Sequence, residues 1–174
     1  MERPVSQLVV AGVLCRRGRV LVAQRREGKP LAGMWEFPGG KVEDETPEDA
    51  LVRELKEELN ITATEIAPLS SVPQAHDSVS IRFWMCLAWD GEPSGAEGQV
   101  IRWVHVDDLE RYAMPPADEE MIGHLRTFFA VGDKMMASGS SSDSHTTRRA
   151  YWRAAIRISD MVEQQPQLRL RFVE

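Results

Sequence analysis

Apolar residues gather along the chain in short runs that favour β-strands. The first run, Ser6–Cys15, is almost continuously apolar, which is typical of a central strand, and Arg19–Gln24 follows it after an arginine-rich turn. Later runs again combine β-branched and aromatic residues. The predicted strands are Ser6–Cys15, Arg19–Gln24, Thr62–Leu69, Val79–Trp89 and Gln99–Val104.

Helical spacing of apolar residues first appears between Thr46 and Asn60. Thr46 is a favourable N-cap, Pro47 suits the first helical position, and Asn60 suits a left-handed stop. We therefore predict a short helix between these ends. Its apolar side, expected to face the core, consists of Val52, Leu55 and Leu59.

A second helix is predicted late in the chain, after a short helical turn at Asp107–Arg111. It opens at the Pro115-Pro116 pair and runs to about Ala130. Its apolar side consists of Met121, Ile122, Leu125, Phe128 and Phe129. The order of elements, strands around one helix with a second helix near the end, is consistent with an α/β domain.

The composition changes after this second helix. Residues 137–144 are rich in serine and glycine, as flexible linkers are, and residues 147–174 hold six arginines against three acidic residues. We predict a folded domain over residues 1–132, a linker over 133–146, and a basic tail over 147–174. The tail pattern favours a helix followed by a short strand. We expect the tail to dock on its own domain or on a second subunit, and the alternative is that it binds another partner or nucleic acid.

Composition limits the classes of function. The 174 residues are 43% hydrophobic, enough for one domain with an appendage, and the net charge of −6 provides no basic field for long nucleic acid. No apolar run reaches the roughly 18 residues of a membrane span, and the first residues lack the layout of a signal peptide. We therefore expect a cytoplasmic protein without a membrane partner. Cys15 and Cys86, both in apolar runs, are expected to be reduced and buried.

The polar side of the first helix carries the candidate chemistry. Glu54, Glu57 and Glu58 lie at positions i, i+3 and i+4, so their carboxylates converge within one turn. Their mutual repulsion is relieved by a divalent cation, and hard oxygen ligands favour Mg²⁺ or Mn²⁺. Arg53, one turn before Glu57, is placed to orient it. The alternative for three glutamates alone is a solvated acidic helix face.

A glycine pair precedes this helix. Pro38-Gly39-Gly40 predicts a tight turn whose bare backbone can approach a phosphate or offer a carbonyl oxygen to a metal.

Together these residues resemble the Nudix box, the signature of the Nudix hydrolases. The pattern is met in order by Gly39, Glu45, Arg53-Glu54, Leu55, Glu57-Glu58, Asn60 and Ile61. Asn60 replaces the usual final glycine and tolerates the same left-handed conformation. The box fits only when counted from Gly39 rather than Gly40, so the loop Lys41–Glu45 is one residue shorter than in relatives with a similar WEFPGGK opening. The resemblance implies an α/β/α sandwich with a mixed central sheet.

The resemblance also implies roles for single residues. Mg²⁺, or Mn²⁺ in its place, is expected on the Gly39 carbonyl and on Glu54, Glu57, Glu58 and Glu97. Glu97 belongs to an EGQ stretch similar to that of MutT-like members of the family, in which this glutamate approaches the metal. Substrate contacts are expected from Arg25, which matches a phosphate-binding arginine, and from the EFPGGK segment, that is Glu36, Phe37, Gly39, Gly40 and Lys41.

Asp118 completes the expected site. Pro-Pro-Ala-Asp at a helix start resembles the base-reading corner of MutT-like enzymes, and a carboxylate there accepts hydrogen bonds from a guanine-type base or from the 4-amino group of cytosine. The alternative is that Asp118 only caps the helix and favours its positive end.

The function implied is metal-dependent hydrolysis of a nucleoside triphosphate to a monophosphate and pyrophosphate, as in nucleotide-pool sanitation. Arg53, Glu54, Glu57, Glu58 and Glu97 form the expected catalytic set, with Glu54 or Glu97 as the general base. Two alternatives stay open: a nucleoside diphosphate linked to another group, such as ADP-ribose or a dinucleoside polyphosphate, as substrate, and a Nudix domain that binds nucleotide without turnover. The expected state is a monomer or a homodimer with the tail at an interface.

Overall fold

The computed structural model describes residues 7–73, 79–138 and 153–154. The chain divides into two compact units, Met1–Met121 and Ile122–Glu174. The first unit holds the sheet, the first helix and the predicted site residues. Of the second unit, the structure describes the remainder of the last helix and residues 153–154.

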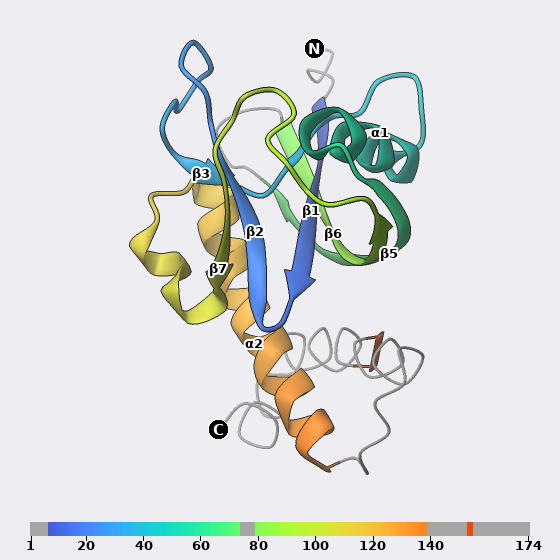
Figure 1. The fold of residues 1–174 in the computed structure, drawn as a ribbon, viewed down its shortest axis with the longest axis vertical. Helices are drawn as coiled ribbons and strands as arrows, with labels where there is room; N and C mark the ends of the chain where they lie inside the picture. Colours follow the sequence, from blue (N-terminus) through green and yellow to red (C-terminus); the bar gives the residue numbers. More distant parts are fainter. Residues whose placement is uncertain (1–6, 74–78, 139–152, 155–174) are drawn as a thin grey trace, which may run out of the picture. The chain divides into compact units, whose positions relative to one another are not determined.

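Seven strands of the described residues form one mixed sheet with the path β3-β2-β1-β6-β5. In its centre β1 runs parallel to β6, with Gln7 opposite Val79 and Leu14 opposite Cys86, whereas the other pairs are antiparallel (Figure 1). Strand β4 pairs with β1, and β7 pairs with β2. The strands are β1 (Gln7–Arg16), β2 (Arg19–Gln24), β3 (Trp35–Glu36), β4 (Gly39–Lys41), β5 (Thr62–Pro73), β6 (Val79–Asp90) and β7 (Ile101–His105).

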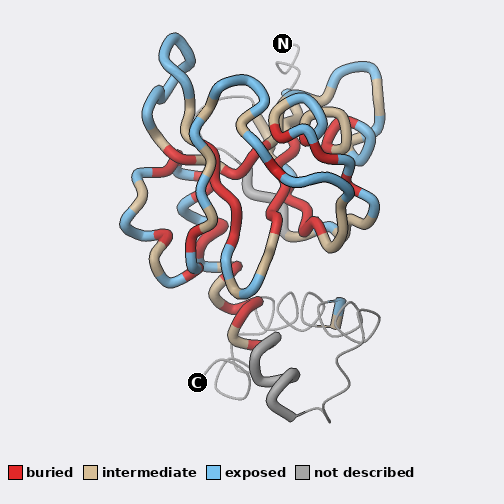
Figure 2. Tube along the Cα trace, viewed as in Figure 1, coloured by how far each residue is buried: buried red, intermediate tan, exposed pale blue. Residues whose placement is uncertain are grey.

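Helix α1 (Pro47–Leu59) packs its apolar side on this sheet. Leu55 and Leu59 are fully buried and Val52 is half-buried, as the spacing predicts. Each buried leucine contributes about 1.5–3 kcal/mol through removal of apolar surface from water. Gly12 on β1 allows the close approach, because a Cβ atom there would lie 3.2 Å from a methyl group of Leu51. Figure 2 shows buried positions concentrated along the central strands and the inner side of α1.

Both ends of α1 agree with the sequence. The hydroxyl oxygen of Thr46 accepts a hydrogen bond from the N–H of Asp49 at 3.1 Å, and Pro47 is the first helical residue. Asn60 adopts the left-handed conformation, with φ 56°, and its N–H donates to the carbonyl of Lys56 at 3.1 Å. These contacts fix where the helix begins and ends, and hence which carboxylates lie on its polar side.

The last elements of the first unit are a 3-10 turn, η1 (Val106–Arg111), and the start of α2 (Pro116–Ser138). All five residues predicted for the apolar side of α2 are buried. The structure describes no helix long and apolar enough to cross a membrane within residues 7–73, 79–138 and 153–154. In the same residues both cysteines are free thiols, with Cys86 buried and Cys15 half-buried.

Several predicted boundaries are wrong. The expected turn at Pro38–Gly40 is instead strand β4, because the backbone of Gly39–Lys41 finds partners on β1. Strand β5 continues to Pro73, four positions beyond its predicted end at Leu69, because it stays paired with β6. Helix α2 continues to Ser138, so residues 133–138 are helical rather than linker. The other predictions for the tail lie outside the described residues, apart from a helical pair at 153–154.

Candidate active site

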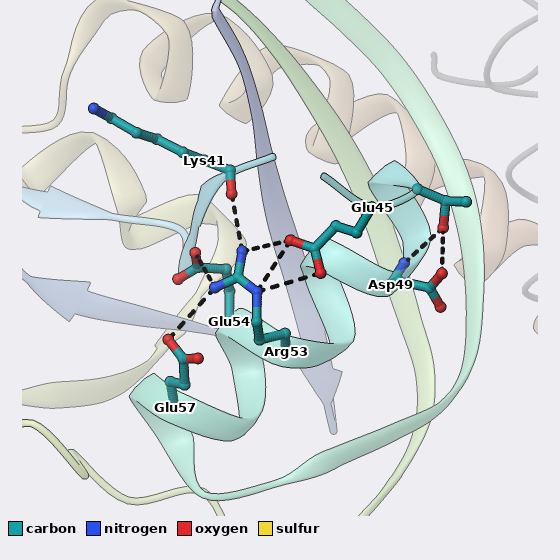
Figure 3. Close-up of polar contacts among 7 residues, drawn as sticks. Lys41, Glu45, Asp49, Arg53, Glu54 and Glu57 are labelled. Carbon is teal, nitrogen blue, oxygen red and sulfur yellow. Dashed lines mark hydrogen bonds and ion pairs between the residues drawn. The ribbon is translucent and has the colours of Figure 1, made fainter. Parts of the chain in front are cut away.

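Arg53 lies at the centre of the polar side of α1 (Figure 3). Its guanidinium donates to Glu45 at 2.7 Å, to Glu54 at 2.8 Å and to the backbone carbonyl of Lys41 at 3.0 Å. Glu57 is a more distant partner at 3.5 Å. We call Arg53, Glu45, Glu54 and Glu57 the Arg53 cluster. Arg53 was predicted to orient Glu57, but its shorter contacts are to Glu45 and Glu54.

The charges of the Arg53 cluster are set by the competition between this arginine and burial. The hydrogen bond from Arg53 lowers the pKa of Glu45, which is therefore ionised at neutral pH. Burial raises the pKa of Glu54, and the opposing hydrogen bond and charge of Arg53 do not cancel the rise. The charges of Glu57 and Glu97 add to that rise, so these carboxylates lie within electrostatic reach of Glu54.

Glu58 projects from the same helix toward strand β4. Its carboxylate accepts a hydrogen bond from the N–H of Gly39 at 3.1 Å. Burial raises the pKa of Glu58 to about 7; the Gly39 N–H opposes the rise, whereas the negative charges of Glu36, Glu54 and Glu97 add to it. Excess negative charge is therefore concentrated where α1 faces β4, as expected for a site that takes up a cation.

The two glycines of β4 allow this close approach. A Cβ atom on Gly39 would overlap the backbone carbonyl of Val10, and one on Gly40 would overlap the carboxylate of Glu54. Only bare backbone fits between β1 and the acidic side of α1. The short loop Lys41–Glu45 still brings Glu45 onto Arg53, while the exposed side chain of Lys41 extends away from the cluster (Figure 3).

Glu97 lies in the loop between β6 and β7, outside the box. Its carboxylate pairs with Arg26 at 3.0 Å, and its backbone carbonyl accepts from the same guanidinium at 2.6 Å. Gln99 contacts both this loop and α1, because its side chain donates to the carbonyl of Glu58 at 2.7 Å and accepts from the N–H of Glu97 at 3.0 Å. Sequence reasoning assigned no role to Arg26 or Gln99. The available signal was their position, next to Arg25 and two residues after Glu97.

The remaining predicted residues form a separate group, the Asp118 cluster, which consists of Asp118, Phe37, Glu36 and Arg25. Asp118 is 6% exposed and accepts a hydrogen bond from the N–H of Phe37 at 3.0 Å. Arg25 forms an ion pair with Glu36 and donates to the carbonyl of Pro30 at 2.7 Å. The start of α2 is thereby tied to the segment between β3 and β4.

Burial dominates the acid–base properties of this second cluster. It raises the pKa of Asp118 to about 7, against the hydrogen bond from Phe37 and with a further contribution from the charge of Glu36. Burial also raises the pKa of Glu36, although Arg25 opposes that rise. Asp118 is therefore present in both its neutral and its ionised form near neutral pH.

The donor atoms suit a hard cation, but their side chains have other partners. Within the described ranges no three histidine, cysteine, aspartate or glutamate residues are arranged as a ready metal-binding group. The carboxylates are held by Arg53, by Arg26 and by the N–H of Gly39. All the candidate donors are oxygen atoms, and the carboxylates near Glu58 repel one another, so the chemistry of the set fits Mg²⁺ or Mn²⁺.

Comparison with known proteins gives concordant matches. A family model described as NUDIX domain matches residues 5–125. The chain is 35% identical over 125 residues to the 8-oxo-dGTP diphosphatase of Escherichia coli, covering 69% of this chain and 95% of that protein. It is 38% identical over 126 residues to the CTP pyrophosphohydrolase of the same organism, covering 71% and 91%.

A solved structure from a study of MutT from Aliivibrio salmonicida and Vibrio cholerae is also similar. It aligns with a TM-score of 0.62 at 37% sequence identity, covering 68% of this chain and 95% of that structure. The residues that the family model matches, 5–125, contain the mixed sheet and α1, and the solved structure is of the same family, so the predicted α/β fold is confirmed.

Proposed function

The chain belongs to the NUDIX family and is a hydrolase of phosphoric anhydrides, and on that premise we propose that it converts a nucleoside triphosphate to a monophosphate and pyrophosphate. The relatives named 8-oxo-dGTP diphosphatase and CTP pyrophosphohydrolase support a triphosphate substrate. The observation that carries the proposal is the concentration of carboxylates between α1 and β4, where Glu54 and Glu58 have raised pKa values.

Mg²⁺ or Mn²⁺ would be held by Glu54, Glu57, Glu58, Glu97 and the carbonyl of Gly39. When bound, such a cation offsets phosphate charge and acidifies water. Hard oxygen donors of this kind are the ligands that both ions prefer. The proposal therefore requires turnover to depend on a divalent cation.

The chain itself supplies positioning and proton transfer. Water attacks a phosphorus of the triphosphate, the bond from that phosphorus to a bridging oxygen breaks to release the monophosphate and pyrophosphate, and Glu54 or Glu97 accepts the proton of the water. Glu45 and Arg53 hold Glu54 in place through an ion-paired chain of contacts. Arg25 binds a phosphate of the substrate, with its guanidinium shared between that phosphate and Glu36.

Asp118 is proposed to contact the base. Its carboxyl group accepts from the N–H of Phe37 and from its own backbone N–H, and two carboxyl oxygens can accept a further donor from the base. A guanine-type base offers N1–H and a 2-amino group, and cytosine offers its 4-amino group. The proposed substrates are therefore 8-oxo-dGTP or a cytosine nucleotide.

Pyrophosphate release with Mg²⁺ across 8-oxo-dGTP, dGTP, dCTP, 5-methyl-dCTP, dATP, dTTP and ADP-ribose tests the proposal. We expect one guanine-type or cytosine triphosphate to be favoured by about 100-fold in kcat/KM, about 2.7 kcal/mol of differential transition-state binding. EDTA should abolish release, and a Glu57→Gln preparation provides the matched inactive control. Nucleotide binding without release from any compound would contradict the proposal and favour a binding domain.

A further inference from the structure

The loop between β6 and β7 rests on the C-terminal end of α1. The N–H of Ser94 donates to the carbonyl of Leu59 at 3.0 Å, and the N–H of Ala96 donates to the carbonyl of Glu58 at 3.0 Å. The last carbonyl groups of a helix have no partners within the helix, so these bonds satisfy them. The loop is therefore joined to the helix that carries Glu58.

Gln99 adds a second connection at the same place. Its side-chain amide donates to the carbonyl of Glu58 at 2.7 Å and accepts from the backbone N–H of Glu97 at 3.0 Å. One planar group thus bridges two residues from different elements, both expected at the metal. An amide can do this because it carries a donor and an acceptor side by side.

A role in helix capping alone does not account for Gln99. The carbonyl of Glu58 already accepts from the N–H of Ala96, so it would keep a partner if the Gln99 side chain were removed. The N–H of Glu97, in contrast, is bound by the Gln99 amide oxygen. The consequence of losing Gln99 therefore falls on the position of Glu97.

Arg26 binds the other polar groups of Glu97, its backbone carbonyl and its carboxylate. Its guanidinium binds the carbonyl of Glu97 at 2.6 Å and the carboxylate at 3.0 Å. Together Gln99 and Arg26 contact the N–H, the carbonyl and the carboxylate of one exposed loop residue. Such complete restraint is unusual for a surface glutamate, because ordering a long charged side chain costs conformational entropy.

We propose that Gln99 is a positioning residue. It fixes the position of the Glu97 loop relative to Glu58, so that the Glu97 carboxylate faces the reacting phosphates. The inference rests on the proposed function for its consequence in turnover. The restraint itself is a property of the free protein. Gln99 touches no reacting atom and acts through Glu97.

A double-mutant cycle separates positioning from general stability. We expect Gln99→Leu to lower kcat by about 10-fold or more with KM changed less than about 2-fold, because displacement of a reacting group by about 1 Å can cost up to about 100-fold. In a Glu97→Gln background the same change should cost less than about 2-fold, because the group that it positions has already been removed. An equal loss in both backgrounds, or a kcat within about 2-fold of wild type, would overturn the proposal.

A second measurement needs no substrate and no metal. Hydrogen exchange at the amide of Glu97, followed by NMR in the full chain, should become at least about 10-fold faster in Gln99→Leu while the thermal midpoint stays within a few degrees. Unchanged exchange would overturn the proposal. If wild type proves inactive on every nucleotide, the proposed function fails, and this exchange measurement still decides whether Gln99 restrains Glu97.

Two further variants keep the test interpretable. Glu92→Gln breaks the ion pair with Arg16, 2.8 Å long, near the start of the same loop, and should leave both kcat and Glu97 exchange unchanged. Gln99→Met replaces Gln99→Leu if that variant does not fold. Methionine has about the length of glutamine but neither its N–H donor nor its amide oxygen, so the same fall in kcat and the same faster exchange at Glu97 are expected.

Discussion

The Arg53 cluster and the Asp118 cluster use the same residue types to opposite effect. In each, an arginine faces carboxylates, yet the pKa of Glu45 is lowered whereas the pKa of Asp118 is raised to about 7. Arg53 is the first cause of the change at Glu45, whereas burial is the first cause at Asp118. The balance between burial and a direct hydrogen bond from an arginine therefore decides which carboxyl group keeps its charge.

Glu54 lies between these two extremes. It contacts Arg53 at 2.8 Å, but its side chain is only 15% exposed and its pKa is raised. Burial thus outweighs Arg53 at Glu54, whose carboxylate lies against Gly40 of β4, whereas the hydrogen bond from Arg53 outweighs burial at Glu45. Carboxylates with raised pKa values beside β4 suit a site that takes up a cation.

The largest expected effect comes from replacing the arginine at the centre of the Arg53 cluster. Arg53→Lys keeps the charge but loses the planar fork that reaches Glu45, Glu54 and the Lys41 carbonyl at once. We expect kcat/KM for the preferred nucleotide to fall by about 100-fold or more, about 2.7 kcal/mol, in steady-state pyrophosphate assays.

The matched control for this substitution is Arg111→Lys. Arg111 forms an exposed i,i+3 ion pair with Asp108 at 3.1 Å, away from the site residues. Exposed pairs of this kind contribute little, so its activity should equal that of wild type. Activity of Arg53→Lys within about 3-fold of wild type would show that charge alone, without the fork, organises the cluster.

The helix that carries Arg53, Glu54 and Glu57 was predictable from sequence because its signals are local, whereas the contact of Arg53 with Glu45, eight positions away and ahead of the helix, was not. The caps at Thr46 and Asn60 fix the helix, and the i, i+3, i+4 spacing then places the glutamates on one side. Burial of Leu55 and Leu59 follows from the same periodicity. Short-range rules of helix geometry suffice for all of these.

The Asp118 cluster and the Gln99 bridge were not predictable in this way. The hydrogen bond from Phe37 to Asp118 joins residues 81 positions apart, and that from Gln99 to Glu58 joins residues 41 apart. Strand β4 likewise exists because β1 provides its hydrogen-bond partners, whereas the local Pro-Gly-Gly sequence favours a turn. Propensity yields to tertiary pairing at such positions.

The Asp118 cluster can be tested through the pH dependence of stability. Because the pKa of Asp118 is raised from 3.8 to about 7, the folded protein keeps a proton that the unfolded chain has lost between these pH values. The contribution of Asp118 to the free energy of unfolding therefore falls as the pH rises to about 7. Asp118→Asn removes this dependence and can still accept from the Phe37 N–H.

We expect the stability of Asp118→Asn relative to wild type to increase by about 2–3 kcal/mol between pH 5 and pH 8. Urea unfolding of both proteins at the two pH values measures this difference. Asp108→Asn, at an exposed position, serves as the control and should show no comparable change. A constant difference for Asp118→Asn would mean that Asp118 is ionised throughout this range, as Glu45 is.

The smallest expected effect comes from Gly40→Ala, which tests whether β4 holds Glu54 in position without disturbing the fold. In Gly40→Ala the new methyl group would overlap the Glu54 carboxylate, which is the mobile end of a side chain, so Glu54 can move aside while the sheet stays intact. We expect kcat to fall about 10-fold, about 1.4 kcal/mol, with the free energy of unfolding changed by less than about 1 kcal/mol.

Gly39→Ala instead meets the rigid carbonyl of Val10 and should chiefly lower the thermal midpoint. Gly123→Ala, in helix α2 with open space around the new methyl group, is the control for an added methyl group that overlaps no other atom, and it should leave kcat unchanged. Full activity in Gly40→Ala would show that Glu54 is not held by β4 during turnover, and would favour Glu97 as the proton acceptor.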